Sequence, residues 1–343
     1  MKNKKIISTI LFLILAWLTF DILFKDQSFL ATIDIVKNMK PIWILLAFIS
    51  AIIYVSLEGI MIWYLLRVRG CKHKAIRCIM YSFIGFFYSG VTPSATGGQP
   101  MQLYYMSKDK LKIGDSTVVL MTVATIYKLV LVIIGGLIAV FCYPSIKESF
   151  DGYIYLYWLG LFLNLIVVII LVAIITSPKF IRAICMFFER FMVKIKLLKP
   201  SEQRVSNIEK LSDDYRHTVS FFMRNKTHIM VTLLLTFTQR MSLFIITVFV
   251  YLGMGYTYKS LMELLYILIF QAAICVAVDM LPLPGAQGIS EILYQTIFGT
   301  IFIGPYLTTS ALVTRGFSFY LLLLIGALVS LHAYFYYRKR DNS

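Results

Sequence analysis

Two short Pro/Gly-rich stretches interrupt long apolar runs and carry residue types that could bind an anionic group. They read T-P-S-A-T-G-G-Q-P over Thr92–Pro100 and L-P-L-P-G-A-Q-G-I-S-E over Leu281–Glu291. Glycines let a backbone come close to a ligand, and a helix that starts after Pro100 would direct its positive end at the first loop. The candidate binding residues of the loops are Thr92, Ser94, Thr96, Gly97, Gly98, Gln99, Gly285, Gln287, Gly288 and Glu291. The alternative is that both loops are water-lined turns between kinked packing helices.

Charged residues inside apolar runs are the second candidate set, because each costs roughly 2.5–3.5 kcal/mol on insertion scales. They are Glu58, Lys128, Arg240, Glu263, Asp279, Glu291 and Arg315. Lys128 and Arg315 each follow one of the two loops, so both cations could face one central cavity and bind a lipid phosphate. We expect Arg315 to be the main phosphate ligand. The open alternatives are buried pairs with Glu58, Asp279 or Glu291, or snorkelling to an interface.

Motifs for enzyme chemistry are missing from the sequence. It contains no G-x-S-x-G, Walker A, H-E-x-x-H or dinucleotide-binding motif. Its five cysteines form no CxxC pair, and its four histidines lie far apart along the chain. We therefore predict no catalytic residue, no metal site and no cofactor.

The composition determines the class of protein that must position these groups. Of 343 residues, 59% are hydrophobic and 15% charged, with a mean hydropathy of +0.80. Several apolar runs exceed the roughly 20 residues that cross a bilayer, which excludes a soluble, secreted or disordered chain. The net charge of +16 concentrates in loops that the positive-inside rule places in the cytoplasm, so we expect no nucleic acid to be bound directly. The fold class is an all-α polytopic membrane protein.

Hydropathy divides the chain into spans and broken segments. We predict an uncleaved first span over Ile6–Phe24, and we predict further full spans over Ile42–Leu66, Ser116–Cys142, Tyr153–Thr176, Ile229–Leu252 and Thr308–Tyr337. We treat 1–343 as a single integral membrane domain. Its parts are the first span with an external segment (1–40), a first half (41–176), a basic cytoplasmic segment (177–228) and a second half (229–343).

Each half contains a pair of apolar segments around one of the loops. Residues 78–106 are flanked by basic residues on both sides, which predicts a re-entrant hairpin entering from the cytoplasm. Residues 261–303 would form the second hairpin, which enters from outside. This is the pattern of an inverted repeat, in which paired broken helices point to a transport site. We expect Gly98 and Gly285 to approach each other near the midplane.

Charge also predicts the topology, with both termini in the cytoplasm. Lys72, Lys110, Lys196 and Lys339 should lie in the cytoplasm, and Lys147 and Lys259 outside.

The two loops, G-V-T-P-S-A-T-G-G-Q-P-M-Q-L-Y-Y-M (Gly90–Met106) and Leu281–Glu291, resemble the two signatures of the lysylphosphatidylglycerol synthase transmembrane-domain family. That family is the flippase-like membrane part of the multiple peptide resistance factor. Ala286 stands where many members have a second glycine. In two-part members, a soluble domain makes aminoacylated phosphatidylglycerol and the membrane part moves it outward. This sequence ends soon after Tyr337, so we expect it to be a stand-alone member without the synthase domain.

The resemblance implies translocation of an anionic or aminoacylated phospholipid, such as lysylphosphatidylglycerol, across the bacterial cytoplasmic membrane. The expected partner is therefore phosphatidylglycerol or its aminoacyl derivative, together with either a second copy of the chain or a separate synthase. Two alternatives stay open: a phosphatidylglycerol lysyltransferase or its membrane subunit, and a non-transporting scaffold for an envelope-lipid enzyme. We expect no catalysis by the chain on its own.

Overall fold

The structure is a computed structural model that describes residues 29–92, 95–176, 224–281 and 283–341, with positions 183, 186, 187, 190, 219 and 220. This part of the chain is helical and contains no strand. Six of its helical segments are long and apolar enough to cross a membrane: Pro41–Val68, Ile113–Phe141, Tyr143–Ala173, Lys226–Gly253, Leu261–Val278 and Pro305–Arg340. The prediction of an all-α polytopic membrane protein is confirmed. The predicted first span, Ser94 and most of the basic segment 177–228 lie outside the described residues.

The α-helices are α2 (Phe29–Asn38), α3 (Pro41–Val68), α4 (Ala75–Gly90), α5 (Gly98–Lys108), α6 (Ile113–Phe141), α7 (Tyr143–Phe150), α8 (Ile154–Thr176), α11 (Lys226–Gly253), α12 (Leu261–Val278), α13 (Ile289–Phe298), α14 (Pro305–Arg315) and α15 (Leu321–Asp341). Short 3₁₀ turns η2 (Asp151–Tyr153) and η3 (Pro284–Ala286) precede α8 and α13, and the π-helical segment η4 (Gly316–Tyr320) joins α14 to α15.

Helix α3 shows how the sequence forms these elements. Proline at the first helical position suits the missing N–H of that site and its fixed φ, and Pro41 occupies it in α3. The 28 residues of α3 span about 42 Å at 1.5 Å per residue, enough to cross a bilayer. The helix ends before Gly70, whose φ of 82° lies in the left-handed region.

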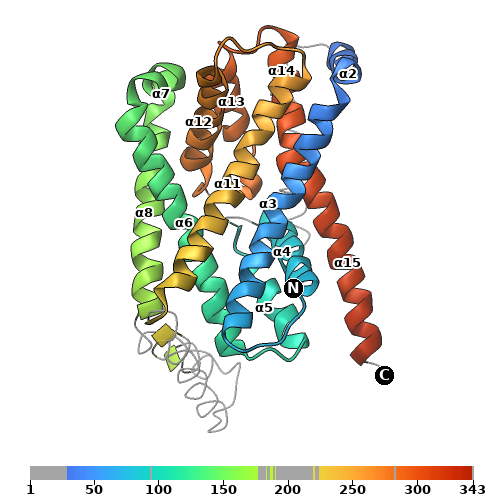
Figure 1. Ribbon diagram of the computed structural model, residues 1–343, viewed down its shortest axis with the longest axis vertical. Helices are drawn as coiled ribbons and strands as arrows, with labels where there is room; N and C mark the ends of the chain where they lie inside the picture. The colour runs from blue at the N-terminus through green and yellow to red at the C-terminus, as the bar shows by residue number, and fades with distance from the viewer. Residues whose placement is uncertain are drawn as a thin grey trace.

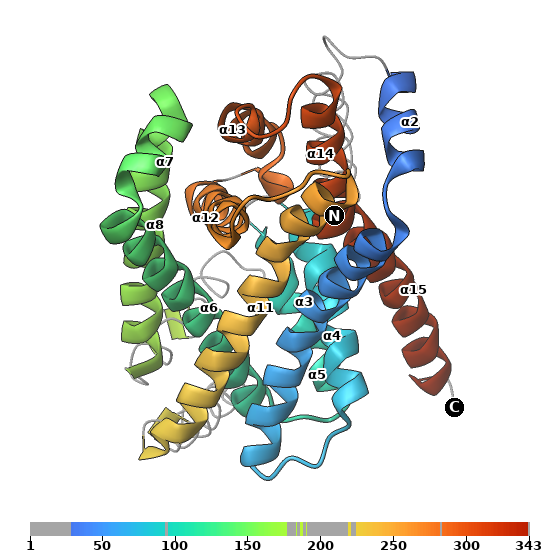
Figure 2. The ribbon, with the colours of Figure 1, turned by 45° about the horizontal axis from the view of Figure 1, so that its top comes forward.

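Helices α3 and α11 lie side by side through the middle of the molecule, with α8 at one edge and α15 at the other (Figures 1 and 2). The most apolar window of α11 is 44% buried, whereas those of α8 and of the α14–α15 segment are each 22% buried. The outer helices leave large apolar side chains exposed, including Phe162 and Ile169 on α8 and Leu324 and Leu328 on α15. Such a surface suits contact with lipid tails.

Two hairpins of shorter helices pack against this frame. The α4–α5 hairpin occupies the lower half of Figure 1, and the α12–α13 hairpin occupies the upper half. Helices α4 and α5 have 16 and 11 residues, so neither is long enough to cross a bilayer. Helix α12 of the second hairpin has 18 residues and is by itself long enough to cross a membrane. The structure thus contains a pair of helices around each of the two loops, in opposite halves of the molecule; the inverted repeat itself stays a prediction.

Close helix packing holds the first hairpin on α3. A Cβ atom added at Gly59 of α3 would collide with the backbone of Cys78 and Ile79 in α4. No local sequence pattern marks this glycine. Only a residue without a side chain lets the two helices come so close.

Two predicted boundaries differ from the structure. The run over Thr308–Tyr337 is not one α-helix, because the π-helical segment η4 begins directly after Arg315. Between the predicted spans that end at Cys142 and begin at Tyr153, the structure has the short helix α7, with proline in its first turn. Single-turn π segments often mark functional positions in helices, and hydropathy does not detect them.

Candidate functional site

The first loop is closed by its own hydrogen bonds. Thr92 Oγ1 donates to the Tyr88 carbonyl at 2.6 Å and accepts from the Gly97 N–H at 2.9 Å. Gly98 is buried, and a Cβ atom there would collide with Ser89 and approach the Gly85 carbonyl. Thr96 and Gln99 are exposed. The hydrogen bonds of Thr92 and the close packing at Gly98 therefore shape the turn between α4 and α5, and a binding role for the loop residues stays a prediction.

The second loop needs an unusual backbone. Gly285 and Gly288 have φ values of 60° and 86°, and Ala286 has a φ of 53°. Left-handed conformations are easy for glycine and strained for other residues, which explains why a glycine would suit position 286. The side chain of Gln287 is 1% exposed, and neither of its amide atoms has a hydrogen-bond partner in the described protein.

Arg315 forms hydrogen bonds that stabilise the end of the second loop. Its Nε donates to Glu291 Oε1 at 2.8 Å, and its Nη2 donates to the Gly285 carbonyl at 2.8 Å. The Glu291 side chain is fully buried, and its Oε2 accepts from the Gly288 N–H at 2.6 Å and from the Ser290 hydroxyl at 3.1 Å. Arg315 is therefore paired with a carboxylate, which is the alternative that the sequence left open beside its role as the main phosphate ligand.

Lys128 forms an ion pair that stabilises the beginning of the same loop. Its Nζ contacts Asp279 Oδ2 in an ion pair and lies 3.0 Å from the Met280 sulfur. The hydroxyl of Tyr127 donates to the other oxygen of Asp279. Lys128 thus belongs to a second, partly buried pair, and the structure does not bring Lys128 and Arg315 together as the two free cations of one site. The two pairs instead hold the two ends of one loop.

A third polar contact ties the first hairpin to α3. The Gln102 side chain on α5 donates from Nε2 to Glu58 Oε1 at 2.6 Å. A Cβ atom at Gly85 of α4 would collide with the Gln102 side chain, so this glycine makes room for the amide. Gln102 is 2% exposed and was missed in the sequence because an isolated glutamine in a polar stretch carries no periodic signal.

The two hairpins meet around Phe319 of the π-helical segment. Its ring lies against Gly90, at the end of α4, and against Gly285 in the second loop, and α4 contacts η3 directly. The guanidinium of Arg315 lies 5.0 Å from the centre of the same ring. The end of α4 therefore lies next to the second loop; that Gly98 and Gly285 approach each other near the midplane stays a prediction.

Arg240 on α11 joins the two polar regions. It is 2% exposed, and its Cζ lies 4.7 Å from the ring centre of Tyr54 and 4.2 Å from that of Tyr127. Tyr54 belongs to α3, which carries Glu58, and Tyr127 belongs to α6 and hydrogen-bonds to Asp279. Residues that are distant in sequence thus form a row of buried and partly buried polar groups between the two hairpins.

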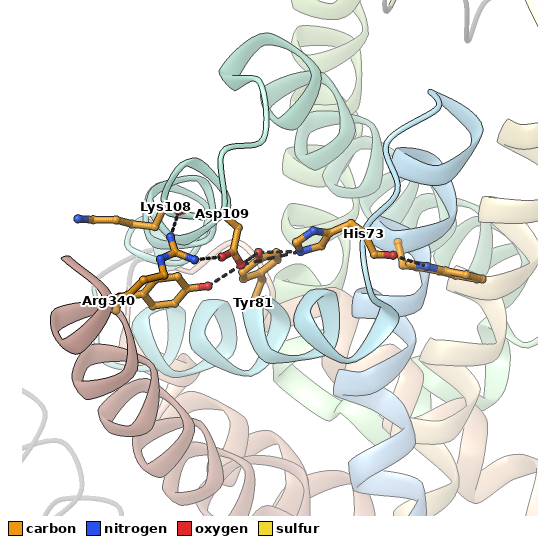
Figure 3. A network of polar contacts seen from close by, with 7 residues as sticks. His73, Tyr81, Lys108, Asp109 and Arg340 are labelled. Carbon is orange, nitrogen blue, oxygen red and sulfur yellow. Dashed lines mark hydrogen bonds and ion pairs between the residues drawn. The ribbon is translucent and has the colours of Figure 1, made fainter. Parts of the chain in front are cut away.

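One end of the bundle, which we call the basic end, carries the connections 69–74 and 109–112 and the end of α15 (Figure 1). Asp109 is the centre of a network there (Figure 3). Its carboxylate accepts from the Tyr81 and Tyr337 hydroxyls at 2.5 Å each and from Arg340 Nη1 at 2.9 Å. Arg340 also donates to the Lys108 carbonyl. The network joins α4 and the end of α5 to the end of α15.

Burial and hydrogen bonding set the protonation states in this network. Burial alone would raise the pKa of Asp109, but the hydrogen bonds from Tyr337, Tyr81 and Arg340 outweigh burial and lower it. Burial lowers the pKa of His73 more than the nearby Asp109 carboxylate raises it. His73 is therefore neutral near pH 7, and its Nε2 shares a 2.9 Å hydrogen bond with the Tyr81 hydroxyl.

The fold and these buried groups define a class: a multi-pass helical membrane protein in which two broken hairpins are joined by charged residues inside an apolar shell. Residues 5–326 match the sequence profile described as "Lysylphosphatidylglycerol synthase TM region". The chain belongs to this family, which confirms the resemblance seen in the two loops and indicates a membrane role in lipid handling. A search of curated proteins gave no match.

Proposed function

We propose that the protein moves an anionic or aminoacylated phospholipid, such as lysylphosphatidylglycerol, between the two leaflets of the bacterial cytoplasmic membrane. The observation that carries the proposal is the row of buried and partly buried polar residues between the two broken hairpins, which consists of Glu58, Gln102, Arg240, Asp279 and Lys128. A lipid headgroup crosses hydrocarbon only at a large desolvation cost. A polar route inside an apolar protein lowers that cost.

The charge distribution supports an orientation with the basic end in the cytoplasm. Arg67 lies in the last turn of α3, Arg69, Lys72 and Lys74 on the connection to α4, and Arg77 in the first turn of α4. Arg338, Lys339 and Arg340 lie at the end of α15. The positive-inside rule places such loops in the cytoplasm. The first hairpin would then enter from the cytoplasm and the second from outside.

The proposal is tested with the purified protein in vesicles that contain phosphatidylglycerol with a fluorescent acyl chain. A membrane-impermeant reductant such as dithionite quenches only the outer leaflet. We expect the wild type to bring the inner-leaflet lipid within reach of the reductant, and we expect the double variant Lys128→Met with Asp279→Asn to fold but move lipid slowly. The double change removes both charges of the pair, so it strands neither.

The Glu263→Gln variant is the matched control, because Glu263 lies in the exposed first turn of α12 and bonds the Lys259 N–H. It should move lipid at the wild-type rate. A wild-type rate equal to that of protein-free vesicles would contradict the proposal and favour the scaffold. Lysine transfer from charged tRNA to phosphatidylglycerol by the purified chain would instead favour the lysyltransferase.

A further inference from the structure

Glu58 differs from the other carboxylates inside the bundle in its partner. An arginine or lysine lies within ion-pair distance of each of four others, which are Asp109, Asp115, Asp279 and Glu291. Among the described residues, no cation lies within that distance of Glu58, which is partly buried in the membrane-spanning helix α3. An ionised carboxylate in this position keeps a desolvation cost that a cation in contact would offset.

The hydrogen-bond partner of Glu58 is a neutral amide. Gln102 Nε2 donates to Glu58 Oε1 at 2.6 Å, and Gln102 is 2% exposed. An amide carries both donors and an acceptor, so it can donate to a carboxylate or, with its nitrogen and oxygen exchanged, accept from a protonated carboxyl group. Arginine and lysine carry donors only. The contact between Glu58 and Gln102 therefore suits both protonation states, whereas the pairs at Asp279 and Glu291 suit only the ionised state.

The charge nearest in effect to Glu58 is that of Arg240 on α11. The guanidinium of Arg240 hydrogen-bonds the side chains of Tyr54 and Cys275, so it acts on Glu58 from beyond ion-pair distance. Tyr54, one turn earlier on α3, is the other titratable neighbour. Three titratable side chains of α4 interact with Asp109 instead: Arg77, Cys78 and Tyr81. Burial thus opposes the ionised form of Glu58 while the charge of Arg240 favours it.

Glu58 also lies where α3 meets the first hairpin. The next residue, Gly59, packs against the backbone of α4, and Gly85 of α4 leaves the space that the Gln102 side chain fills. The hydrogen bond from Gln102 is a polar contact between α3 and α5. A hydrogen bond to an ionised group is stronger than one between neutral groups. Proton uptake by Glu58 would therefore weaken the attachment of the first hairpin to α3.

We propose that Glu58 is a proton-binding site that couples lipid movement to the proton concentration. A proton from water forms an O–H bond with a carboxylate oxygen of Glu58, and the Gln102 amide turns to accept that O–H. The first hairpin is then held less tightly on α3, and release of the proton to water restores the original contact. The coupling rests on the proposed function, whereas the proton site can be measured without it.

The test of the site is infrared difference spectroscopy of the purified protein in lipid vesicles over a range of pH. The spectrum of the wild type minus that of Glu58→Gln isolates the one carboxyl group. We expect a carboxylic-acid C=O band to replace a carboxylate band as the pH falls, within the pH range in which the protein moves lipid. Glu58→Asp, which keeps a carboxyl group, should retain such a band at a shifted frequency.

The test of the coupling is the rate of lipid movement in the same vesicles. In the wild type, the rate should rise as Glu58 takes up its proton, with the midpoint found in the infrared titration. Glu58→Gln resembles the protonated form and should lose this pH dependence, and Glu58→Asp should keep one. Glu263→Gln is the control and should keep the pH dependence of the wild type.

A Glu58 carboxylate that stays ionised throughout the active pH range would overturn the proton site. The same pH dependence of movement in the wild type and in folded Glu58→Gln protein would overturn the coupling and leave translocation in place. Wild-type protein that takes up a proton at Glu58 but moves no lipid at any pH would contradict the proposed function and leave the proton site in place.

Discussion

The pair between Arg315 and Glu291 is expected to stabilise the fold, and Arg315→Ala tests this directly. The substitution leaves the fully buried Glu291 carboxylate without its cation and the Gly285 carbonyl without its donor. Removing one partner of a buried ion pair costs about 3–5 kcal/mol. The Arg315 side chain is 19% exposed, so water compensates part of the loss.

We therefore expect Arg315→Ala to lose about 3 kcal/mol of unfolding free energy, at the lower end of that range. At 1.4 kcal/mol per factor of ten, this lowers the ratio of folded to unfolded protein roughly a hundredfold. Adding Glu291→Gln should recover most of the loss, because the glutamine oxygen still accepts the Gly288 N–H while no charge is stranded.

The assay is denaturant titration of the purified proteins in mixed micelles, together with the yield of folded protein from membranes. Arg338→Ala, an exposed arginine on α15, serves as the control and should unfold like the wild type. Wild-type stability of Arg315→Ala would refute a structural pair. A double variant no more stable than the single variant would show that Glu291 is not the group left unpaired.

Three further predictions concern other parts of the bundle. The hydrogen bonds of Asp109 lower its pKa, so the ionised carboxylate stabilises the fold above the ordinary value near 3.8, and this stabilisation is lost as pH falls through the lowered pKa. Asp109→Asn should therefore unfold more easily than the wild type at pH 7. Equal stability of the two proteins at pH 7 would count against the network. Gly59→Leu should cost about 3 kcal/mol or more of unfolding free energy in the same titration, because its side chain meets the backbone of Ile79, whereas wild-type stability would contradict the close packing. Cysteines placed at Lys72 and Lys259 should label from opposite sides with an impermeant maleimide, and labelling of Lys72→Cys from outside would reverse the proposed orientation.

The sequence alone was sufficient for the helices and the two loops. A long apolar run with few charges must cross a bilayer as a helix, because only a helix satisfies its own backbone there; α3, α6, α8 and α11 accordingly lie within a few residues of their predicted spans. The Pro/Gly interruptions at Thr92–Pro100 and Leu281–Glu291 equally indicated both hairpins and the family. Such features depend on composition and on local chemistry, both of which can be read directly from the sequence.

Only the tertiary structure decided which charges are neutralised. Arg315, Lys128 and Arg240 look alike in sequence, as single cations in apolar runs. Packing gives the first two a carboxylate each from the second hairpin region and places the third between two tyrosine rings from different helices. These partners lie 24 residues apart for Arg315 and Glu291 and 151 apart for Lys128 and Asp279. Pairing in a low-dielectric interior depends on distances of a few ångströms between separate helices, and hydropathy along a single chain contains no measure of them.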